Sequence, residues 1–288
     1  MKSPNSISVL GIDLGGTKVA AGKIIHGVLQ KQMEMKINAS SEDYMDTVLL
    51  ISELIGSLRD ESTEGIGIGV PGLVDREKGV VFDVLNIPSW KEVPLKTLLE
   101  NKFNIPVTIN NDSNCFALGE YQYGTYAGTN DFVGITIGTG MGSGIIKNGA
   151  IMPDAHCCSG EFGTMPYLDG IYENYSSGMF FLREFNLNGE EVAIAADRGE
   201  SWAIEAYEQF GIHLGNAIKT IKMAVDPALI VIGGSVAKAS YLFEESMWKS
   251  VTDFAFPSAL EGFMVKFTQT PNIAILGAAA LCITPSTH

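Results

Sequence analysis

Two stretches of sequence decide the fold: Gly11-Ile-Asp-Leu-Gly-Gly-Thr17 and Gly134-Ile-Thr-Ile-Gly-Thr-Gly140. Each is an apolar strand that ends in a glycine-rich turn, and a second apolar strand follows each turn. A tight turn then closes each copy, at Lys23-Ile-Ile-His-Gly27 and at Gly144-Ile-Ile-Lys-Asn-Gly149. Such patterns recur in many α/β proteins, but the near-constant spacing between the copies favours two related halves. We therefore expect two similar lobes that face each other across a cleft.

The rest of the chain alternates between strand and helix patterns. Short apolar runs predict strands over residues 8–13, 18–25, 29–37, 65–70, 107–110 and 229–232. Apolar residues at three- and four-residue steps, with the usual end signals, predict helices over residues 41–59, 94–100, 113–121, 201–225 and 274–282. This alternation predicts an α/β fold. We expect an N-terminal lobe of residues 1–121, joined by residues 274–288, and a C-terminal lobe of residues 122–273.

Composition excludes several classes of protein. The 288 residues are 46% hydrophobic, which excludes disorder as the main state. With 19 Lys and Arg against 33 Asp and Glu, the net charge of −14 argues against binding to nucleic acid or to anionic membranes. The apolar stretch of residues 273–283 is too short for a membrane span of about 20 residues, and the N-terminus lacks the apolar core of a signal peptide. The four cysteines form no disulfide framework, so we expect a cytoplasmic protein.

The glycine-rich turns at residues 15–17 and 138–140 are candidate phosphate sites. Successive backbone N–H groups in such turns form a concave surface that suits phosphate. Neither turn is a P-loop, because the Gly-x-x-x-x-Gly-Lys-Ser/Thr pattern is absent. Each could be only a structural hairpin, but two of them in related copies predict that both hold one polyphosphate.

Asp112 is the candidate catalytic base. The segment Asn110-Asn-Asp112 lies at a strand end just before a predicted helix, where α/β folds place their ligands. An aspartate at a helix start is usually an N-cap. The alternative is a carboxylate that takes the proton of an attacking hydroxyl during phosphoryl transfer.

Three further groups of residues leave alternatives open. Glu161 and Glu173 lie beside glycine and aromatic residues, as carboxylates that bind sugar hydroxyls do, or are solvated surface residues. Gly233-Gly234 follows a buried strand, which fits the close approach of a nucleotide or a tight turn. The run His156-Cys-Cys158 could belong to a metal site, but three adjacent residues rarely point at one ion, so buried thiols are favoured.

Six segments, in sequence order, resemble the ROK family (repressors, open reading frames and sugar kinases) of the actin/hexokinase-type ATPase superfamily. They are Asp13-Leu-Gly-Gly-Thr17, Gly65-Ile-Gly-Ile-Gly-Val-Pro-Gly72, Asn86-Ile-Pro-Ser-Trp90, Asn110-Asn-Asp-Ser-Asn114, Gly138-Thr-Gly-Met-Gly142 and Ile230-Val-Ile-Gly-Gly234. The resemblance implies an actin-like ATPase (ribonuclease H-like) fold and a homodimer. It also implies a glucokinase-like enzyme that phosphorylates a hexose or hexose derivative with ATP and Mg²⁺, usually at the C6 hydroxyl.

The same resemblance assigns roles to individual residues. Asp112 would be the general base, and Asp13 would orient Mg²⁺ through water. The sugar would be bound by Gly72, Asn111, Glu161 and Glu173. The nucleotide would be held at its phosphates by Gly15, Gly16, Thr17, Gly138, Thr139 and Gly140, and would lie against Gly233 and Gly234.

Two departures from the family pattern bear on the substrate. The family commonly has Gly-Glu-x-Gly-His, whose histidine binds sugar and a structural zinc ion, and here that position is Thr164. The cysteine-rich zinc loop is replaced by Tyr167-Leu-Asp-Gly-Ile-Tyr172, which has no cysteine. We therefore expect no zinc site, a shortened loop that retains Glu173, and room for a substituted sugar or a glycoside.

Two other functions compete with a sugar kinase. One is a non-catalytic, sugar-sensing regulator of the same family that acts without a DNA-binding domain. The presence of Asp112 and of the second glycine turn favours the kinase. The other is a carboxylate or acyl-phosphate kinase of the same superfamily. Such enzymes need basic residues for an acidic substrate, whereas the segments near the predicted sugar site offer Asn, Asp and Glu.

Overall fold

The computed structural model describes residues 7–283, which pack as two compact units. The first contains the described residues up to Asn130, together with Gly144–Ser159 and the described residues from Gln269 on. The second contains Asp131–Ser143 and Gly160–Thr268. The chain therefore passes between the two units after residues 130, 143, 159 and 268, and the predicted lobe limits at residues 121 and 273 stay predictions.

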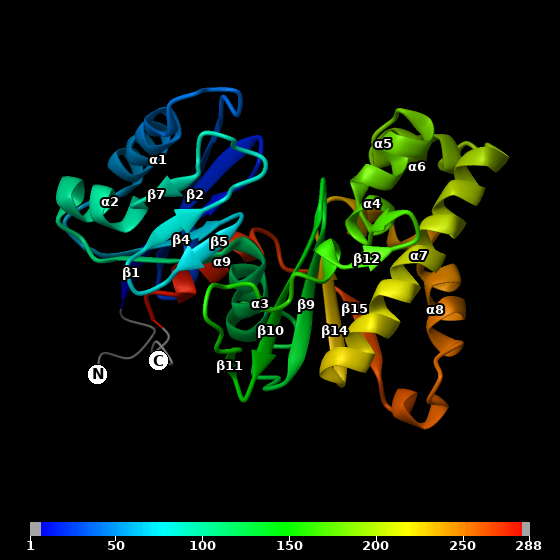
Figure 1. Ribbon diagram of the computed structural model, residues 1–288. Helices are drawn as coiled ribbons and strands as arrows, with labels where there is room; N and C mark the ends of the chain where they lie inside the picture. The colour runs from blue at the N-terminus through cyan, green and yellow to red at the C-terminus, as the bar shows by residue number, and fades with distance from the viewer. Residues whose placement is uncertain (1–6, 284–288) are drawn as a thin grey trace. The chain divides into compact units, whose positions relative to one another are not determined.

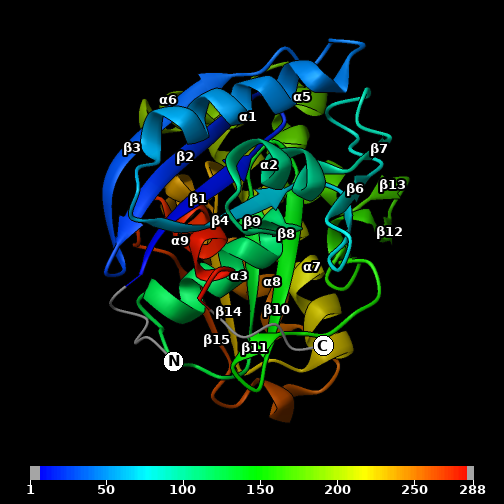
Figure 2. The same cartoon turned by 90° about the vertical axis from the view of Figure 1, so that its left-hand side faces the viewer.

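The first unit is built on a five-stranded sheet with the order β3-β2-β1-β4-β8. Strands β1, β2 and β3 are antiparallel neighbours, whereas β4 runs parallel to β1 and β8 runs parallel to β4 (Figures 1 and 2). The elements of this unit are β1 (Ser8–Leu14), β2 (Lys18–Ile25), β3 (Val28–Lys36), α1 (Tyr44–Leu58), β4 (Thr63–Val70), β5 (Leu73–Asp75), β6 (Val80–Phe82), β7 (Glu92–Val93), α2 (Leu95–Phe103), β8 (Val107–Asn111), α3 (Asp112–Tyr123), β11 (Ala150–Ile151) and α9 (Ile273–Ala280).

The alternating sequence of β4 gives the two faces of this sheet different partners. Ile66 and Ile68 belong to the apolar core that includes buried residues of α1 and α2. On the opposite face, a side chain at Gly67 would overlap the backbone of Ala278 in α9, and one at Gly69 would lie 3.3 Å from the Cα atom of Asp112. Because these glycines have no side chains, α9 and the start of α3 lie directly against the sheet (Figure 2). This packing fixes the position of Asp112 at the end of β4.

The second unit contains most of a sheet with the order β11-β10-β9-β14-β15. Strands β9, β14 and β15 are parallel, with β14 between the other two, and β10 pairs antiparallel with β11. The elements are β9 (Phe132–Ile137), β10 (Met141–Lys147), η2 (Phe162–Thr164), β12 (Pro166–Tyr167), β13 (Gly170–Ile171), α4 (Glu173–Ser176), α5 (Gly178–Phe185), α6 (Gly189–Asp197), α7 (Ser201–Val225), β14 (Leu229–Gly233), η3 (Val236–Leu242), α8 (Glu244–Thr252), η4 (Pro257–Leu260) and β15 (Met264–Phe267).

The two sheets follow the same plan. In each sheet, three strands that follow one another in sequence lie side by side, and two further strands continue the sheet beyond the first of them. These two strands run parallel to that first strand, which is β1 in one sheet and β9 in the other. The predicted α/β class and the two related halves are confirmed.

Helix limits differ by a few residues from those predicted. Helix α1 begins at Tyr44 rather than residue 41, because the carboxylate of Asp43 accepts the N–H of Met45 at 2.8 Å and caps the helix there. Within residues 7–283, no helix is both long and apolar enough to cross a membrane.

Candidate active site

Asp112 is the first residue of α3, at the carboxyl ends of the parallel strands β4 and β8. The N-cap is Asn111 and not Asp112: its side-chain oxygen accepts the N–H groups of Ser113 and Asn114 at 2.9 and 3.3 Å. The alternative that Asp112 is the N-cap is therefore wrong, because Asn111 caps the helix. Asp112 is half-buried, and one carboxylate oxygen accepts the Ser113 N–H at 2.8 Å. The side-chain amide of Asn111 also donates to the carbonyl of Gly72 at 3.3 Å, so three predicted site residues lie together.

A segment distant in sequence holds this corner of the first unit. The buried thiol of Cys157 donates to the side-chain oxygen of Asn110 at 3.3 Å. The same oxygen accepts the Asn111 N–H at 2.8 Å and the side-chain amide of Asn114 at 3.0 Å. Burial raises the pKa of Cys157 to about 11, which keeps the thiol protonated as a donor. The prediction of two buried thiols is wrong for Cys158, which is exposed.

The first glycine turn carries a carboxylate in an unfavourable environment. The turn is closed by the Gly15 N–H, which donates to the carbonyl of Lys18 at 2.9 Å. Burial at the end of β1 raises the pKa of Asp13 to about 6, although the positive charge of Lys18 opposes this shift. A side chain at Gly16 would lie 2.9 Å from Asn86, so that glycine is needed for the loop of residues 83–89 to pack on the turn.

The second glycine turn is held by the start of α5. The Gly178 N–H donates to the carbonyl of Gly138 at 2.7 Å, and the Ser177 hydroxyl donates to the carbonyl of Thr139 at 3.0 Å. With these two carbonyls bound from one side, the backbone of the turn is fixed. Sequence analysis assigned no role to Ser177 or Gly178, which end the segment that begins at Glu173.

Glu173 also holds the second glycine turn in place. Its carboxylate accepts the Met141 N–H at 2.9 Å, and a side chain at Gly140 would overlap it. Glu161 lies close enough that the charge of Glu173 adds to burial in raising the pKa of Glu161. The structure therefore brings both predicted glutamates to the start of β10. Thr164 is the last residue of η2 and is exposed. Its hydroxyl donates to the carbonyl of Glu161 at 2.8 Å.

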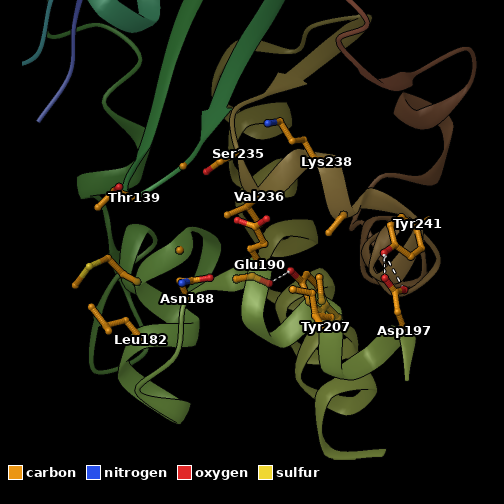
Figure 3. A pocket seen from close by; sticks show the side chains of 17 residues that line it. Thr139, Leu182, Asn188, Glu190, Asp197, Tyr207, Ser235, Val236, Lys238 and Tyr241 are labelled. Carbon is orange, nitrogen blue, oxygen red and sulfur yellow. Dashed lines mark hydrogen bonds between the residues drawn. The ribbon is translucent and has the colours of Figure 1, made fainter. Parts of the chain in front are cut away.

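A pocket of about 530 Å³ opens beside this turn in the second unit (Figure 3). Gly138 and Thr139 line it, as do residues from α5, α6, α7 and η3. Sequence reasoning missed the α6 and η3 side chains Asn188, Glu190, Asp197, Lys238 and Tyr241. The capping box of α6, in which Asn188 and Glu191 bond reciprocally, was a signal for the helix start but not for the pocket.

Gly233 and Gly234 are not among the residues that line this pocket, whereas Ser235 is. Gly234 has a φ of +100°, and a side chain there would overlap the backbone of Ile137. Close packing of β14 on the end of β9 thus accounts for this glycine, which is the tight-turn alternative. Within residues 7–283, no group of three or more His, Cys, Asp or Glu side chains is arranged to hold a metal ion.

Comparison with known proteins decides the family, since the model of the ROK family matches residues 9–284. This chain belongs to the ROK family. Among curated relatives of this ROK protein, the N-acetyl-D-glucosamine kinase of Vibrio cholerae serotype O1 is 31% identical, over 95% of this chain and 99% of its own. The glucokinase of Halalkalibacterium halodurans is 27% identical, over 92% of this chain and 91% of its own.

Solved structures give the same fold. A ROK family glucokinase from Streptomyces griseus, in complex with glucose and AMPPNP, matches this ROK protein with a TM-score of 0.81 at 24% identity. The match covers 95% of this chain and 98% of that one. The predicted family and the predicted actin-like ATPase fold are confirmed.

Proposed function

We propose that this ROK protein is an ATP-dependent sugar kinase. It would transfer the γ-phosphoryl group of ATP to a hydroxyl of a hexose or hexose derivative. The observation that carries the proposal is the corner formed by Gly72, Asn111 and Asp112, where a carboxylate and an amide meet at the carboxyl ends of two parallel strands. Open α/β sheets bind their ligands at this edge. The names of the relatives support the same class of reaction.

Asp112 would act as the general base. As the sugar oxygen forms its bond to the γ-phosphorus, its proton passes to the Asp112 carboxylate, and the bond from the γ-phosphorus to the bridging oxygen breaks to release ADP. The Ser113 N–H bond to Asp112 and the Asn111 cap would hold the carboxylate in place. A carboxylate held by the backbone loses little freedom on reaction, which favours catalysis.

The pocket of the second unit fits a nucleotide. Its volume of about 530 Å³ lies in the range of small-molecule sites, and Gly138 and Thr139 form one of its walls. The Gly140 backbone of this unit, and the Gly15, Gly16 and Thr17 turn of the first unit, would also bind phosphate. Gly233 and Gly234 would act indirectly: the close packing of Gly234 on Ile137 would position Ser235, which lines the pocket.

Asp13 fits a divalent cation. A carboxylate whose pKa burial raises to about 6 is stabilised as an anion when a cation binds nearby. Asp13 would hold Mg²⁺ through water, and the ion would neutralise charge on the β- and γ-phosphates.

The sugar is proposed to be a hexose or an N-acylated hexosamine, attacked at C6. Glu161 and Glu173 would accept hydrogen bonds from its hydroxyls. Thr164 is small and exposed, and would leave room for a substituent on the sugar. The relatives support both kinds of sugar, since one is an N-acetyl-D-glucosamine kinase and the other a glucokinase. We also propose a cytoplasmic homodimer without zinc, as the sequence and the family resemblance suggest.

The test is ADP release from ATP and Mg²⁺ with a panel of glucose, N-acetylglucosamine, N-acetylmannosamine and β-glucosides. Asp112→Asn should lower kcat by at least about 100-fold, as general-base catalysis contributes that much or more. Its sugar affinity, measured by calorimetry, should change little. Turnover of Asp112→Asn near the wild-type rate would refute the base. Wild-type protein that binds a sugar but phosphorylates none would favour the regulator instead.

A further inference from the structure

An exposed aromatic ring stands at one end of the pocket in the second unit. Tyr241 lies on η3 and is 63% exposed, although large aromatic side chains are usually buried. Its hydroxyl donates to the two carboxylate oxygens of Asp197, at 2.9 and 3.0 Å. Asp197 is the last residue of α6, so this bond ties η3 to α6 and restrains the ring while most of its surface stays open.

The ring lies away from the glycine turn. In Figure 3, Thr139 lies at one end of the pocket, and Tyr241 and Asp197 lie together at the opposite end. Asn188, Glu190 and Val236 lie between them. A ligand whose phosphates occupy the turn would therefore extend its other end toward Tyr241. Bare polyphosphate offers nothing that an aromatic ring would bind, whereas every nucleobase has a π face.

We propose that Tyr241, held in place by Asp197, is the platform on which the base of the phosphoryl donor stacks. The inference rests on the proposed function and makes the donor a nucleoside triphosphate rather than inorganic polyphosphate. Tyr241 contacts the ligand, and Asp197 is a positioning residue. Because stacking reads the face of a base and not its edges, this platform by itself tolerates different bases.

Calorimetric titration with ADP and with inorganic tripolyphosphate tests the platform. Tyr241→Ala should weaken ADP binding at least about fivefold, the lower end for stacking of a base on an aromatic ring, and leave tripolyphosphate binding unchanged. Tyr241→Phe keeps the ring but removes its hydrogen bond to Asp197, so it should lose some ADP affinity, as Asp197→Ala does, and no more than about threefold. Asp197→Ala should give an intermediate loss for ADP only, and Asp197→Asn, which keeps an acceptor oxygen, should restore most of it.

The matched control is Phe256→Ala, which removes another exposed ring of the same unit that does not line the pocket, and it should bind both ligands as wild type does. Equal ADP affinity in wild type and Tyr241→Ala would overturn the platform and leave the kinase proposal standing. An equal loss of ADP and tripolyphosphate binding would overturn it too, since the effect would lie at the phosphates. Wild-type protein that binds tripolyphosphate but not ADP would overturn the nucleotide donor itself.

Discussion

Replacing Asp13 by Asn should stabilise the protein at neutral pH and abolish phosphoryl transfer. The carboxylate is half-buried at the end of β1, and burial raises its pKa from 3.8 to about 6 against the opposing charge of Lys18. Folding therefore opposes ionisation of this group. Asn is close in shape but carries no charge, so the variant is free of that cost.

The magnitude follows from the two pKa values. A difference between 3.8 and about 6, at 1.36 kcal/mol for each pKa unit, amounts to about 3 kcal/mol. The sign follows from the direction: a carboxyl whose pKa is raised by folding costs nothing below the unfolded pKa, and its cost grows as pH rises and is complete above the folded pKa. The stability of wild type relative to Asp13→Asn should thus fall between about pH 4 and pH 6.

Urea unfolding of both proteins across this pH range measures the difference. The free energy of unfolding of Asp13→Asn should exceed that of wild type by about 1 kcal/mol at pH 4.5 and by about 3 kcal/mol at pH 7.5. Other titrating groups are common to both proteins and cancel. EDTA should be present, because a bound cation would stabilise the wild-type carboxylate.

The control variant, Asp60→Asn, should change the free energy of unfolding in the opposite direction. A hydrogen bond from Lys23 is the main cause that holds the pKa of Asp60 at about 2, so its ionised form stabilises the fold above the unfolded pKa. Asp60→Asn should therefore be less stable than wild type at neutral pH. A stability difference for Asp13→Asn that does not change with pH, or a variant less stable than wild type at pH 7.5, would refute the reasoning about Asp13.

Two further predictions concern contacts that hold the site. Cys157→Ala should lose about 1 kcal/mol of stability in urea unfolding, because Asn110 loses one donor, and Cys157→Ser should lose less; equal losses would contradict the role of the thiol hydrogen bond. Glu173→Ala should raise KM for ATP several-fold, since the Met141 N–H loses its acceptor beside the second glycine turn, whereas Glu173→Gln should leave KM for ATP near wild type and raise KM for the sugar. A Glu173→Gln variant as impaired toward ATP as Glu173→Ala would show that the charge, and not the hydrogen bond, braces the turn.

The extent of sequence-based prediction can be judged from particular elements. The long helix over residues 201–225 was predicted with its observed limits, because its apolar stripe and its end before Pro227 are local signals. The helix start at Tyr44 was missed by three residues, since an Asp43 cap competes with Ser41 in the same turn. The α6 helix was not predicted, and with it one wall of the pocket was missed.

The sequence by itself determined the two glycine turns, the repeated strand pattern, the Asn111–Asp112 pair at a strand end and the family. These signals lie within a few residues of one another, where backbone geometry and hydrophobic period act directly. Only the tertiary structure decided that Asn111 and not Asp112 caps α3, that Cys157 bonds Asn110 across 47 positions of the chain, and that Tyr241 meets Asp197 across 44. Contacts between such distant residues depend on how the sheets and helices pack, and no local pattern of residues specifies them.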